Sequence, residues 1–339
     1  MQIQENISLK GYNTFGMDVK ARYYSTFSSS DELQTINYKP QTFILGGGSN
    51  ILFTKDYDGL VLKNEIKGIV ELHEDNEYVY VKAGAGENWH QFVMYCINHN
   101  WAGVENLSLI PGNAGAAPIQ NIGAYGVELK EVFYDLEAFH LEEKKVHRFT
   151  LNDCEFGYRD SIFKKKLKND FVILNVTFRL KKHPVFNCSY GALEQELGKM
   201  GVKKLSLKAI SQAVINIRTS KLPDPEKIAN AGSFFKNPVI SQDIFSKLHA
   251  QYPAIPNYPQ PDGNIKLAAG WLIEQCGPKN AVSWKGYHKG DAGCHEKQAL
   301  VLVNYGNANG KEIYDLSEEI LQSVKEKFAV TLVREVNII

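Results

Sequence analysis

At 339 residues the chain is long for a single domain, and two or three domains are expected. Its 38 basic and 38 acidic residues cancel to a formal net charge of zero, which argues against nucleic acid or an anionic membrane as a partner. The sequence has no apolar run long enough to span a bilayer and no signal segment at its start, so a cytoplasmic protein is expected.

The cysteines and histidines give no sign of a metal site. The five cysteines are widely spaced and form no C-x-x-C pair, which is typical of reduced thiols rather than of a disulfide framework or a zinc site. The nine histidines show no H-E-x-x-H spacing. The sequence therefore predicts no structural metal.

The first informative stretch is a glycine-rich loop that follows a predicted short strand at residues 41–45. A loop of three glycines after a strand can turn its backbone amides toward a phosphate. The alternative is a simple tight turn. The residues of this candidate phosphate loop are Gly46, Gly47, Gly48, Ser49 and Asn50.

The next segment reads as a strand, a break and a helix. Residues 78–82 alternate in strand fashion, and a Gly-Ala-Gly break follows at residues 84–86. Trp89 occupies the third glycine position of a dinucleotide-binding fingerprint, so that pattern fails. From Trp89 to Ile97 apolar residues recur at helical spacing, which predicts a core helix.

Residues 109–126 form a second glycine-rich segment, with four glycines, two prolines and four alanines. A solvent loop would be more polar, and a helix would tolerate fewer glycines and prolines. Small, uncharged and irregular backbone is what a chain needs to wrap closely around a large flat ligand. We therefore expect this segment to bind one.

Arg159 lies among aromatic and small residues in the segment 155–161. An arginine there is either a solvated loop charge or a residue that binds a carboxylate through two parallel hydrogen bonds (bidentate binding). A strand is predicted at 171–180 and a helix at 205–219. The two prolines within 221–225 mark the best candidate for a domain boundary.

Ser233 follows a glycine and precedes two phenylalanines in the segment 230–238. A hydroxyl in such dry surroundings suggests proton transfer or ligand contact. The alternative is a Gly-Ser turn over a small aromatic cluster. The rest of the chain is predicted as helices at 243–249, 265–276 and 313–328, loops at 253–261 and 284–293, and strands at 298–305 and 331–336.

The last predicted strand carries two adjacent charges, Arg334 and Glu335. Successive side chains of a strand point to opposite faces, so one charge must face inward or line a cleft. An edge strand with both faces partly wet is the alternative.

Taken together, these stretches closely resemble the UDP-N-acetylenolpyruvoylglucosamine reductase family, flavoenzymes of bacterial peptidoglycan precursor synthesis. The resemblance runs from Asn13 to Glu335, and the segment at 189–191 is similar to the extra loop of the type I form. The segments that carry it are 46–50, 118–126, 157–161, 232–238 and 298–302.

The resemblance implies an α+β protein with a two-subdomain FAD-binding fold of the vanillyl-alcohol oxidase (PCMH) type. The subdomains would be 1–66 and 67–220, and a C-terminal α+β substrate-binding domain would be 221–339. FAD would be non-covalent, since no His or Cys lies between residues 46 and 60. Besides the first loop, the implied FAD residues are Ile110, Pro111, Gly112, Gly115, Ala116, Gln120, Asn121, Ile122 and Gly123.

The same resemblance implies the chemistry. Reduced flavin would deliver a hydride from N5 to C3 of an enolpyruvyl group, Arg159 and Glu335 would polarise its carboxylate, and Ser233 would protonate C2. NADPH would use the same cleft in turn, with no obligate protein partner. The implied residues for the nucleotide-sugar are Tyr125, Tyr190, Lys221, Asn237, Lys285 and Gln298.

One departure and two rival functions stay open. The family commonly has Glu-Pro before the final glutamate and a basic residue two places after it, whereas this chain has Val333-Arg334 and Asn337. Whether Arg334 or Asn337 replaces a nucleotide contact is not decided by the sequence. The rivals are a flavin oxidase of the same fold acting on an alcohol and a colourless, non-catalytic module that binds a nucleotide-sugar.

Overall fold

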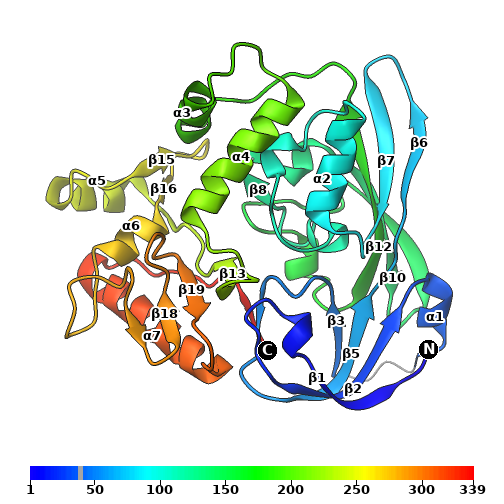
Figure 1. Cartoon of the computed structure of the whole chain (residues 1–339), viewed down its shortest axis with the longest axis horizontal. Helices are drawn as coiled ribbons and strands as arrows, with labels where there is room; N and C mark the ends of the chain where they lie inside the picture. The colour runs from blue at the N-terminus through cyan, green and yellow to red at the C-terminus, as the bar shows by residue number, and fades with distance from the viewer. Residues whose placement is uncertain (37–40) are drawn as a thin grey trace. The chain divides into compact units, whose positions relative to one another are not determined.

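The structure, a computed structural model, describes residues 1–36 and 41–339. These residues fold into two compact units, each built from separate stretches of the chain (Figure 1). Unit 1 comprises Met1–Ile7, Lys20–Gly48 and Asp58–Ser220. Unit 2 comprises Ser8–Val19, Ser49–Tyr57 and Lys221–Ile339. The three domains expected at 1–66, 67–220 and 221–339 stay a prediction.

Unit 1 is built on a five-stranded sheet, antiparallel throughout, with the strand order β11-β10-β12-β7-β6. In its centre Leu136 of β10 pairs with Val176 of β12, which pairs with Ala83 of β7. The strands are β6 (Ile69–Glu74), β7 (Tyr78–Gly84), β10 (Phe133–His140), β11 (Lys145–Thr150) and β12 (Phe171–Lys181).

A second sheet of unit 1 has the order β1-β2-β5-β3, with β3 and β5 parallel. The predicted strand at 41–45 is confirmed as β3, which ends where the glycine loop begins. The strands are β1 (Gln4–Ser8), β2 (Lys20–Phe27), β3 (Thr42–Leu45) and β5 (Tyr57–Asn64).

Helix α2 (Trp89–Asn98) covers the five-stranded sheet and confirms the helix predicted from Trp89. Asn88 caps it by accepting a hydrogen bond from the Gln91 amide, and the ring of Phe92 lies 4.6 Å from that of Phe178 on β12. All its predicted core residues are buried, because one helical face meets the sheet. The other helices of unit 1 are α1 (Ser30–Gln34), α3 (Gly191–Lys199) and α4 (Leu207–Lys221).

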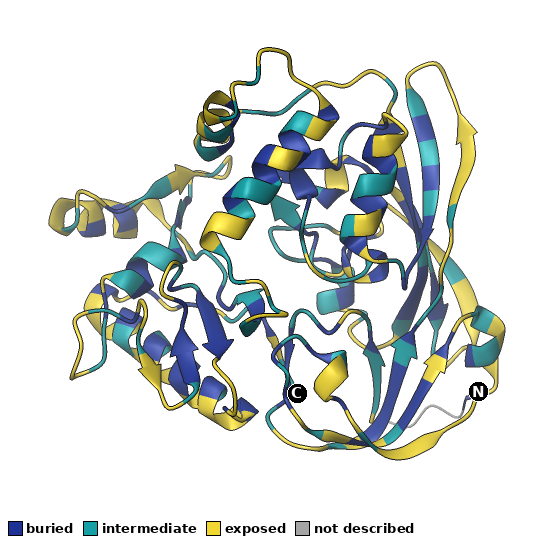
Figure 2. Cartoon of the chain, in the orientation of Figure 1, coloured by how far each residue is buried: buried dark blue, intermediate teal, exposed yellow. Residues whose placement is uncertain are grey.

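Unit 2 has a sheet of order β13-β19-β18-β17, whose inner strands β18 and β19 are buried throughout (Figure 2). Helix α7 (Gly310–Phe328) contacts both inner strands, and Asn309 and Glu312 form a capping box at its start. Strand β20 (Asn337–Ile338) pairs in parallel with β4 (Ile51–Leu52). The sheet strands are β13 (Ala229–Ser233), β17 (His288–Lys289), β18 (Ala292–Cys294) and β19 (Val301–Asn304).

Residues 253–276 differ from the prediction of a loop followed by one helix. They form a hairpin of β15 (Asn257–Pro259) and β16 (Ile265–Leu267), and β16 also pairs with β14 (Val239–Ile240). Helix α6 (Ala269–Glu274) follows, while α5 (Gln242–Gln251) confirms the helix expected at 243–249. Ile265 and Leu267 are buried with the spacing of a strand, and the Asp-Gly turn at 262–263 reverses the chain before them.

The strand predicted at 331–336 is also wrong. In its place the structure has one isolated antiparallel bridge between Arg334 and Phe235, and regular pairing begins only at β20.

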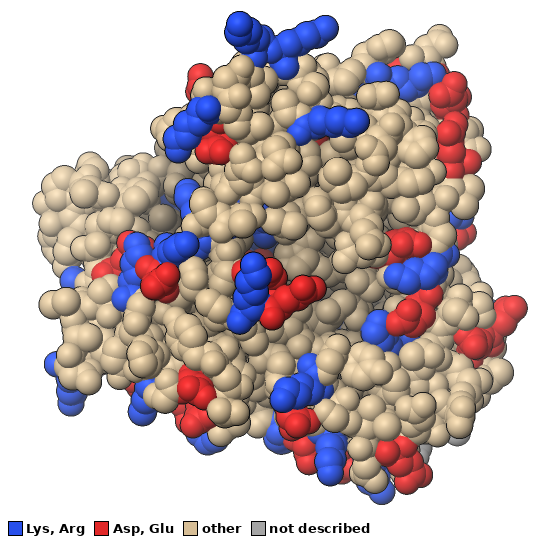
Figure 3. All heavy atoms as spheres, viewed as in Figure 1, with Lys and Arg blue, Asp and Glu red and all other residues tan. Residues whose placement is uncertain are grey.

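Over the face shown in Figure 3, basic and acidic side chains are interspersed rather than gathered into a patch of one sign. Within residues 1–36 and 41–339, no helix is both long and apolar enough to cross a membrane.

Candidate active site

The two predicted glycine segments meet within unit 1. A Cβ atom added to Gly47 would lie 2.9 Å from both the Oδ1 atom of Asn113 and the Cα atom of Gly112. Gly48 and Gly112 have positive φ angles, +64° and +115°. A side chain at position 47 would collide with these atoms, and glycine adopts positive φ angles without steric cost. The segments form a small-residue cradle of the kind that a flat, phosphate-bearing cofactor needs.

The second glycine segment is hydrogen-bonded to residues 85–87, which follow the end of β7. The Gly115 amide donates to the carbonyl of Ala85 at 3.0 Å, and the Ala114 amide donates to that of Glu87 at 2.8 Å. A Cβ atom on Gly115 would lie 2.4 Å from the Cβ atom of Ala85. The cradle is therefore part of the packed fold of unit 1.

Several predicted FAD residues already use their amides within this segment. The amides of Ala116, Asn121 and Ile122 donate to the carbonyls of Asn113, Pro118 and Ala117 at 3.0, 3.3 and 3.1 Å. Like the Gly115 amide, they are engaged by the chain itself. The residues fit FAD as an uncharged cradle, and hydrogen bonds from backbone amides to a phosphate would have to come from elsewhere in the loops.

Arg159 lies in a tight turn of unit 1, between Gly157 and Asp160. The amide of each of these two residues donates to the other's carbonyl, at 3.0 and 3.3 Å, and Arg159 has a φ angle of +53°. Its Nη2 atom donates to the carbonyl of Gly123 at 2.6 Å. A non-glycine residue in this conformation is strained, which is common at functional sites.

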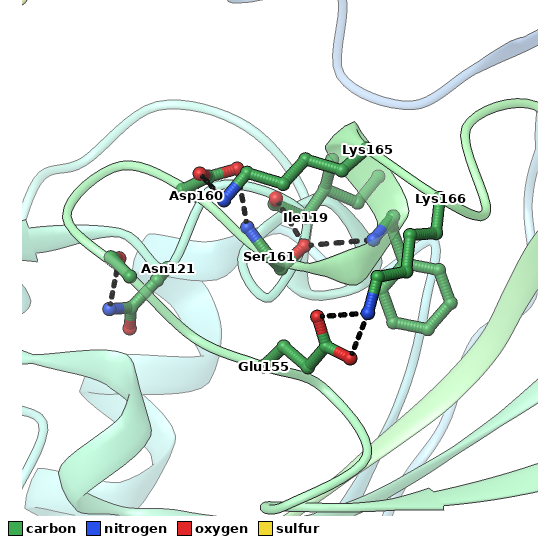
Figure 4. A network of polar contacts seen from close by, with 9 residues as sticks. Ile119, Asn121, Glu155, Asp160, Ser161, Lys165 and Lys166 are labelled. Atoms are coloured by element: carbon green, nitrogen blue, oxygen red, sulfur yellow. Dashed lines mark hydrogen bonds and ion pairs between the residues drawn. The ribbon is translucent and has the colours of Figure 1, made fainter.

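Asn121 fastens this turn to the second glycine segment (Figure 4). It is fully buried, and its Nδ2 atom donates to the Gly157 carbonyl and to Oε2 of Glu128, both at 3.0 Å. Its Oδ1 atom accepts from the Lys130 amide at 3.1 Å. Every hydrogen-bonding group of the Asn121 side chain is thus engaged by the chain, so this amide positions the Arg159 turn.

A second fastening lies beside it in Figure 4, where the Ser161 hydroxyl donates to the Ile119 carbonyl at 2.6 Å. Ser161 is fully buried, and its amide donates to Oδ1 of Asp160 at 3.0 Å. The turn that carries Arg159 is therefore tied to the 119–123 segment by side chains on both sides.

Arg218 is a basic residue of this region that the sequence reasoning missed. Its Nε atom donates to the Leu109 carbonyl at 3.1 Å. Burial lowers the pKa of Arg218, the nearby Tyr125 side chain raises it, and the positive charge of Arg159 lowers it further. The Tyr125 ring packs edge-on against Tyr190 at 5.4 Å, and burial raises the pKa of its hydroxyl. No periodicity distinguishes Arg218 from the basic residues around it.

In unit 2, Ser233 ends strand β13 and is partly buried. The preceding Gly232 has a φ angle of +70°, and its amide donates to the Oδ1 atom of buried Asn230 at 2.8 Å. Phe234 and Phe235 are fully buried, which confirms the predicted apolar surroundings on this side of the serine. Ser233 therefore lies between a turn that is fixed by the Asn230 side chain and two buried aromatic rings.

Glu335 lies on the segment that pairs with the residues after Ser233. Its amide donates to the Phe234 carbonyl at 2.8 Å, and its carbonyl accepts from Nδ2 of Asn50 at 3.3 Å. Arg334 turns to helix α7, where its Nη2 atom lies 2.7 Å from Oε1 of Glu318. Unit 2 therefore brings together Ser233, Glu335 and the predicted loop residue Asn50, while Arg159 belongs to unit 1.

Three of the residues predicted to bind the nucleotide-sugar gather around helix α6 in unit 2. Oδ1 of Asn237 accepts from the Ala269 amide at 2.9 Å, at the start of the helix. Nζ of Lys285 lies 3.1 Å from Oε1 of Glu274, the last helical residue. A Cβ atom on Gly270 would lie 2.7 Å from Oε1 of Gln298.

The other residues predicted to bind the nucleotide-sugar come from other elements of the chain. Lys221 is exposed at the end of α4, and Tyr190, the residue directly before α3, is exposed as well. In the described part of the chain, no group of three or more His, Cys, Asp or Glu side chains is arranged to hold a metal ion.

Two protein families match the chain. The family described as "FAD binding domain" matches residues 31–139, and "UDP-N-acetylenolpyruvoylglucosamine reductase, C-terminal domain" matches residues 224–339. These matches define the class: an FAD-dependent oxidoreductase with the predicted α+β architecture of an FAD-binding fold followed by a C-terminal α+β domain.

The relatives extend over the whole chain. UDP-N-acetylenolpyruvoylglucosamine reductases of Amoebophilus asiaticus and Flavobacterium johnsoniae are 52% and 47% identical to it, with 100% of each chain covered. That of Pseudomonas putida is 48% identical, covering 100% of this chain and 99% of its own. The chain belongs to the UDP-N-acetylenolpyruvoylglucosamine reductase family, which confirms the predicted resemblance.

A solved structure supports the fold. The crystal structure of UDP-N-acetylenolpyruvylglucosamine reductase from Thermus caldophilus superimposes with a TM-score of 0.68 at 22% sequence identity. The superposition covers 100% of this chain and 99% of that chain. At this identity the likeness concerns the fold alone.

Proposed function

We propose that this protein is an NADPH-dependent flavoenzyme of the cytoplasm that makes UDP-N-acetylmuramate for peptidoglycan synthesis. It would reduce the enolpyruvyl group of UDP-N-acetylglucosamine enolpyruvate to the lactyl ether. The observation that carries the proposal is the pairing of the Glu335 segment with the residues after Ser233, within a chain whose full-length relatives bear the name of this reductase.

The glycine cradle of unit 1 supports non-covalent FAD as the cofactor. The loop at 46–50 and the segment 110–123 would hold it, because only their small residues permit the close packing seen at Gly47 and Gly115. FAD reduced by NADPH supplies a hydride when it is bound. The chain's own residues would then bind the carboxylate, stabilise the charge that develops on it, and supply a proton.

Arg159 would bind the carboxylate of the enolpyruvyl group. Addition of a hydride at C3 leaves negative charge at C2, which spreads into this carboxylate. A guanidinium held in place by its turn stabilises such charge without having to reorganise during the reaction. The strained backbone at Arg159 and the fastening of its turn by Asn121 support this role.

Ser233 would donate the proton to C2. A serine hydroxyl is a weak acid, but the developing enolate is a strong base, so the proton transfer does not need a histidine. The buried rings of Phe234 and Phe235 would limit the access of water to the partly buried serine. Glu335, on the paired segment, would polarise the same carboxylate region of the substrate.

The residues around α6 would bind the nucleotide-sugar. Lysine binds a diphosphate as a point charge, and Lys285 suits that part of the substrate. Asn237 and Gln298 offer amides beside the same helix, and Tyr125, Tyr190 and Lys221 would complete the contacts.

The test is an absorption experiment on the purified full-length protein. A flavin spectrum should bleach when NADPH is added without oxygen, and UDP-N-acetylglucosamine enolpyruvate should restore it. Acid precipitation should release the flavin into the supernatant. A colourless protein that still binds the nucleotide-sugar would favour a binding module instead. Reduction by an alcohol, with oxygen consumption, would favour an oxidase.

A further inference from the structure

Leu109 has a left-handed backbone, with a φ angle of +58°. Leucine seldom adopts this conformation, because its Cβ atom crowds the following carbonyl. Strain of this kind persists only where surrounding contacts impose it. Leu109 stands directly before Ile110, Pro111 and Gly112, three of the residues predicted to bind FAD.

Two side chains, one from each of two helices, hold the backbone of Leu109. Its amide donates to Nδ1 of His90 on α2 at 3.0 Å. Its carbonyl accepts from Nε of Arg218 on α4 at 3.1 Å. Both polar groups of this strained residue are therefore fixed by side chains that the proposed mechanism does not otherwise use.

The first turn of α2 fixes the same loop on either side of Leu109. Nε1 of Trp89 donates to the Leu107 carbonyl at 2.9 Å, and the Trp89 amide donates to the Gly112 carbonyl at 2.9 Å. The residue before Pro111 is restricted to extended backbone by the proline ring. With both ends fixed and that residue restricted, the backbone of Leu109 sets the path of the segment.

The contact with His90 requires a neutral imidazole. Nδ1 can accept a hydrogen bond only when the ring proton is on Nε2. Burial, and then the positive charge of Arg218, lower the pKa of His90, which favours the neutral ring. His90 and Arg218, which together form what we call the Leu109 clamp, are thus compatible with each other.

We propose that His90 and Arg218 are positioning residues that hold Leu109 in its left-handed conformation and so preset the 110–112 segment for FAD. The identity of the ligand rests on the proposed function, whereas the clamp itself rests on the contacts above. A segment that is already ordered costs less to bind a ligand than one that must be ordered by it.

The first experiment measures the equilibrium binding of FAD to full-length variants by flavin fluorescence. His90→Ala removes the acceptor and should raise the dissociation constant about tenfold, as expected for a backbone strain no longer held by the fold. His90→Asn places an amide oxygen near the position of Nδ1 and should restore most of the affinity. The control is His99→Ala at the other end of α2, where Nδ1 contacts the Tyr95 carbonyl at 2.8 Å, and its affinity should be unchanged.

A rescue variant separates positioning from a general loss of packing. Glycine adopts positive φ without steric cost, so Leu109→Gly should make the clamp unnecessary. The double variant His90→Ala with Leu109→Gly should bind FAD within about threefold of the wild type, since the strain that the clamp opposes has gone. A double variant as weak as His90→Ala would overturn the proposal, as would normal FAD binding by His90→Ala.

Hydrogen exchange without FAD tests the clamp independently of the ligand. Peptides covering residues 107–112 should exchange about tenfold faster in His90→Ala than in the wild type, and at the wild-type rate in His99→Ala. Unchanged exchange in His90→Ala would overturn the clamp even if FAD binding fell. If the wild type bound no FAD, the proposed function would fail, and the exchange rates would still decide whether the clamp exists.

Discussion

The amide of Glu335 donates a 2.8 Å hydrogen bond to the carbonyl of Phe234, the residue that follows Ser233. Backbone pairing therefore brings the last acidic residue of the chain beside the candidate proton donor. The Asn50 side chain donates to the Glu335 carbonyl at 3.3 Å and adds a third sequence region to the same place. Because Phe234 and Glu335 contribute only backbone groups to these contacts, side-chain substitutions at Ser233 or Glu335 can test chemistry without removing the scaffold.

Arg159→Lys should lower turnover clearly and change substrate affinity less. Lysine keeps the charge but loses the planar fork that matches a carboxylate. An interaction that strengthens as charge develops affects the transition state more than the bound substrate. Steady-state kinetics on the flavin-loaded protein would measure both quantities. A change in affinity alone would make Arg159 a uniform binding contact.

Asn121→Ala should destabilise the protein by about 1–3 kcal/mol, because it removes the three partly buried hydrogen bonds that this fully buried amide makes. Urea unfolding would measure the loss in free energy. The matched control is Asn100→Ala. Asn100 is also left-handed, with a φ angle of +60°, but it is exposed, so this change tests the backbone cost alone. Equal losses for the two variants would contradict a fastening role for the Asn121 side chain.

The strongest periodic signals in the sequence were enough to locate the main elements. The apolar stripe from Trp89 predicts α2, and the β-branched run at 171–180 predicts β12. By contrast, the sequence predicts Ile265 and Leu267 as part of a helix, although they alternate as a strand paired with β14 and β15. Short apolar runs fit either period, and only the tertiary pairing decides between them.

The candidate site likewise contains residues that a local sequence pattern indicates and residues that only the tertiary structure reveals. Composition alone indicated the two glycine segments and Ser233, because small or dry surroundings leave a trace in the sequence. The roles of Asn121 and Arg218 have no such local pattern in the sequence. Both depend on hydrogen bonds to carbonyls far along the chain, at Gly157 and Leu109. Such contacts arise from the packing of separate elements and have no local pattern.

Glu274→Gln should raise the affinity for the nucleotide-sugar a few-fold. Glu274 pairs with Lys285 at 3.1 Å, and both side chains are partly exposed, so the pair adds only about 0–1 kcal/mol to stability. Without this carboxylate, the lysine would be free to bind a phosphate. The control is Glu319→Gln, which removes the partner of Lys289, a lysine with no predicted role. Titration calorimetry would measure affinity, and weaker binding would mean that Glu274 positions Lys285.

Ser233→Ala should separate the two halves of the reaction. Reduction of the flavin by NADPH needs no proton from a serine, so this half should stay nearly intact. Protonation at C2 needs one, and reoxidation by the enolpyruvyl substrate should slow by roughly the 10²–10⁴-fold typical of a positioned general acid. Stability should change little, because the substitution removes one partly buried hydroxyl and leaves the backbone pairing of β13 in place.

Stopped-flow absorbance at the flavin band would follow both halves on one sample of Ser233→Ala. Equal slowing of both would make Ser233 a residue that positions the flavin or a cleft shared by NADPH and the substrate. If neither half slowed, the serine would be part of a simple turn over Phe234 and Phe235. Ser233→Cys is the informative companion, because a thiol is a stronger acid of similar size. If proton donation limits reoxidation, the thiol should recover part of the rate that alanine loses.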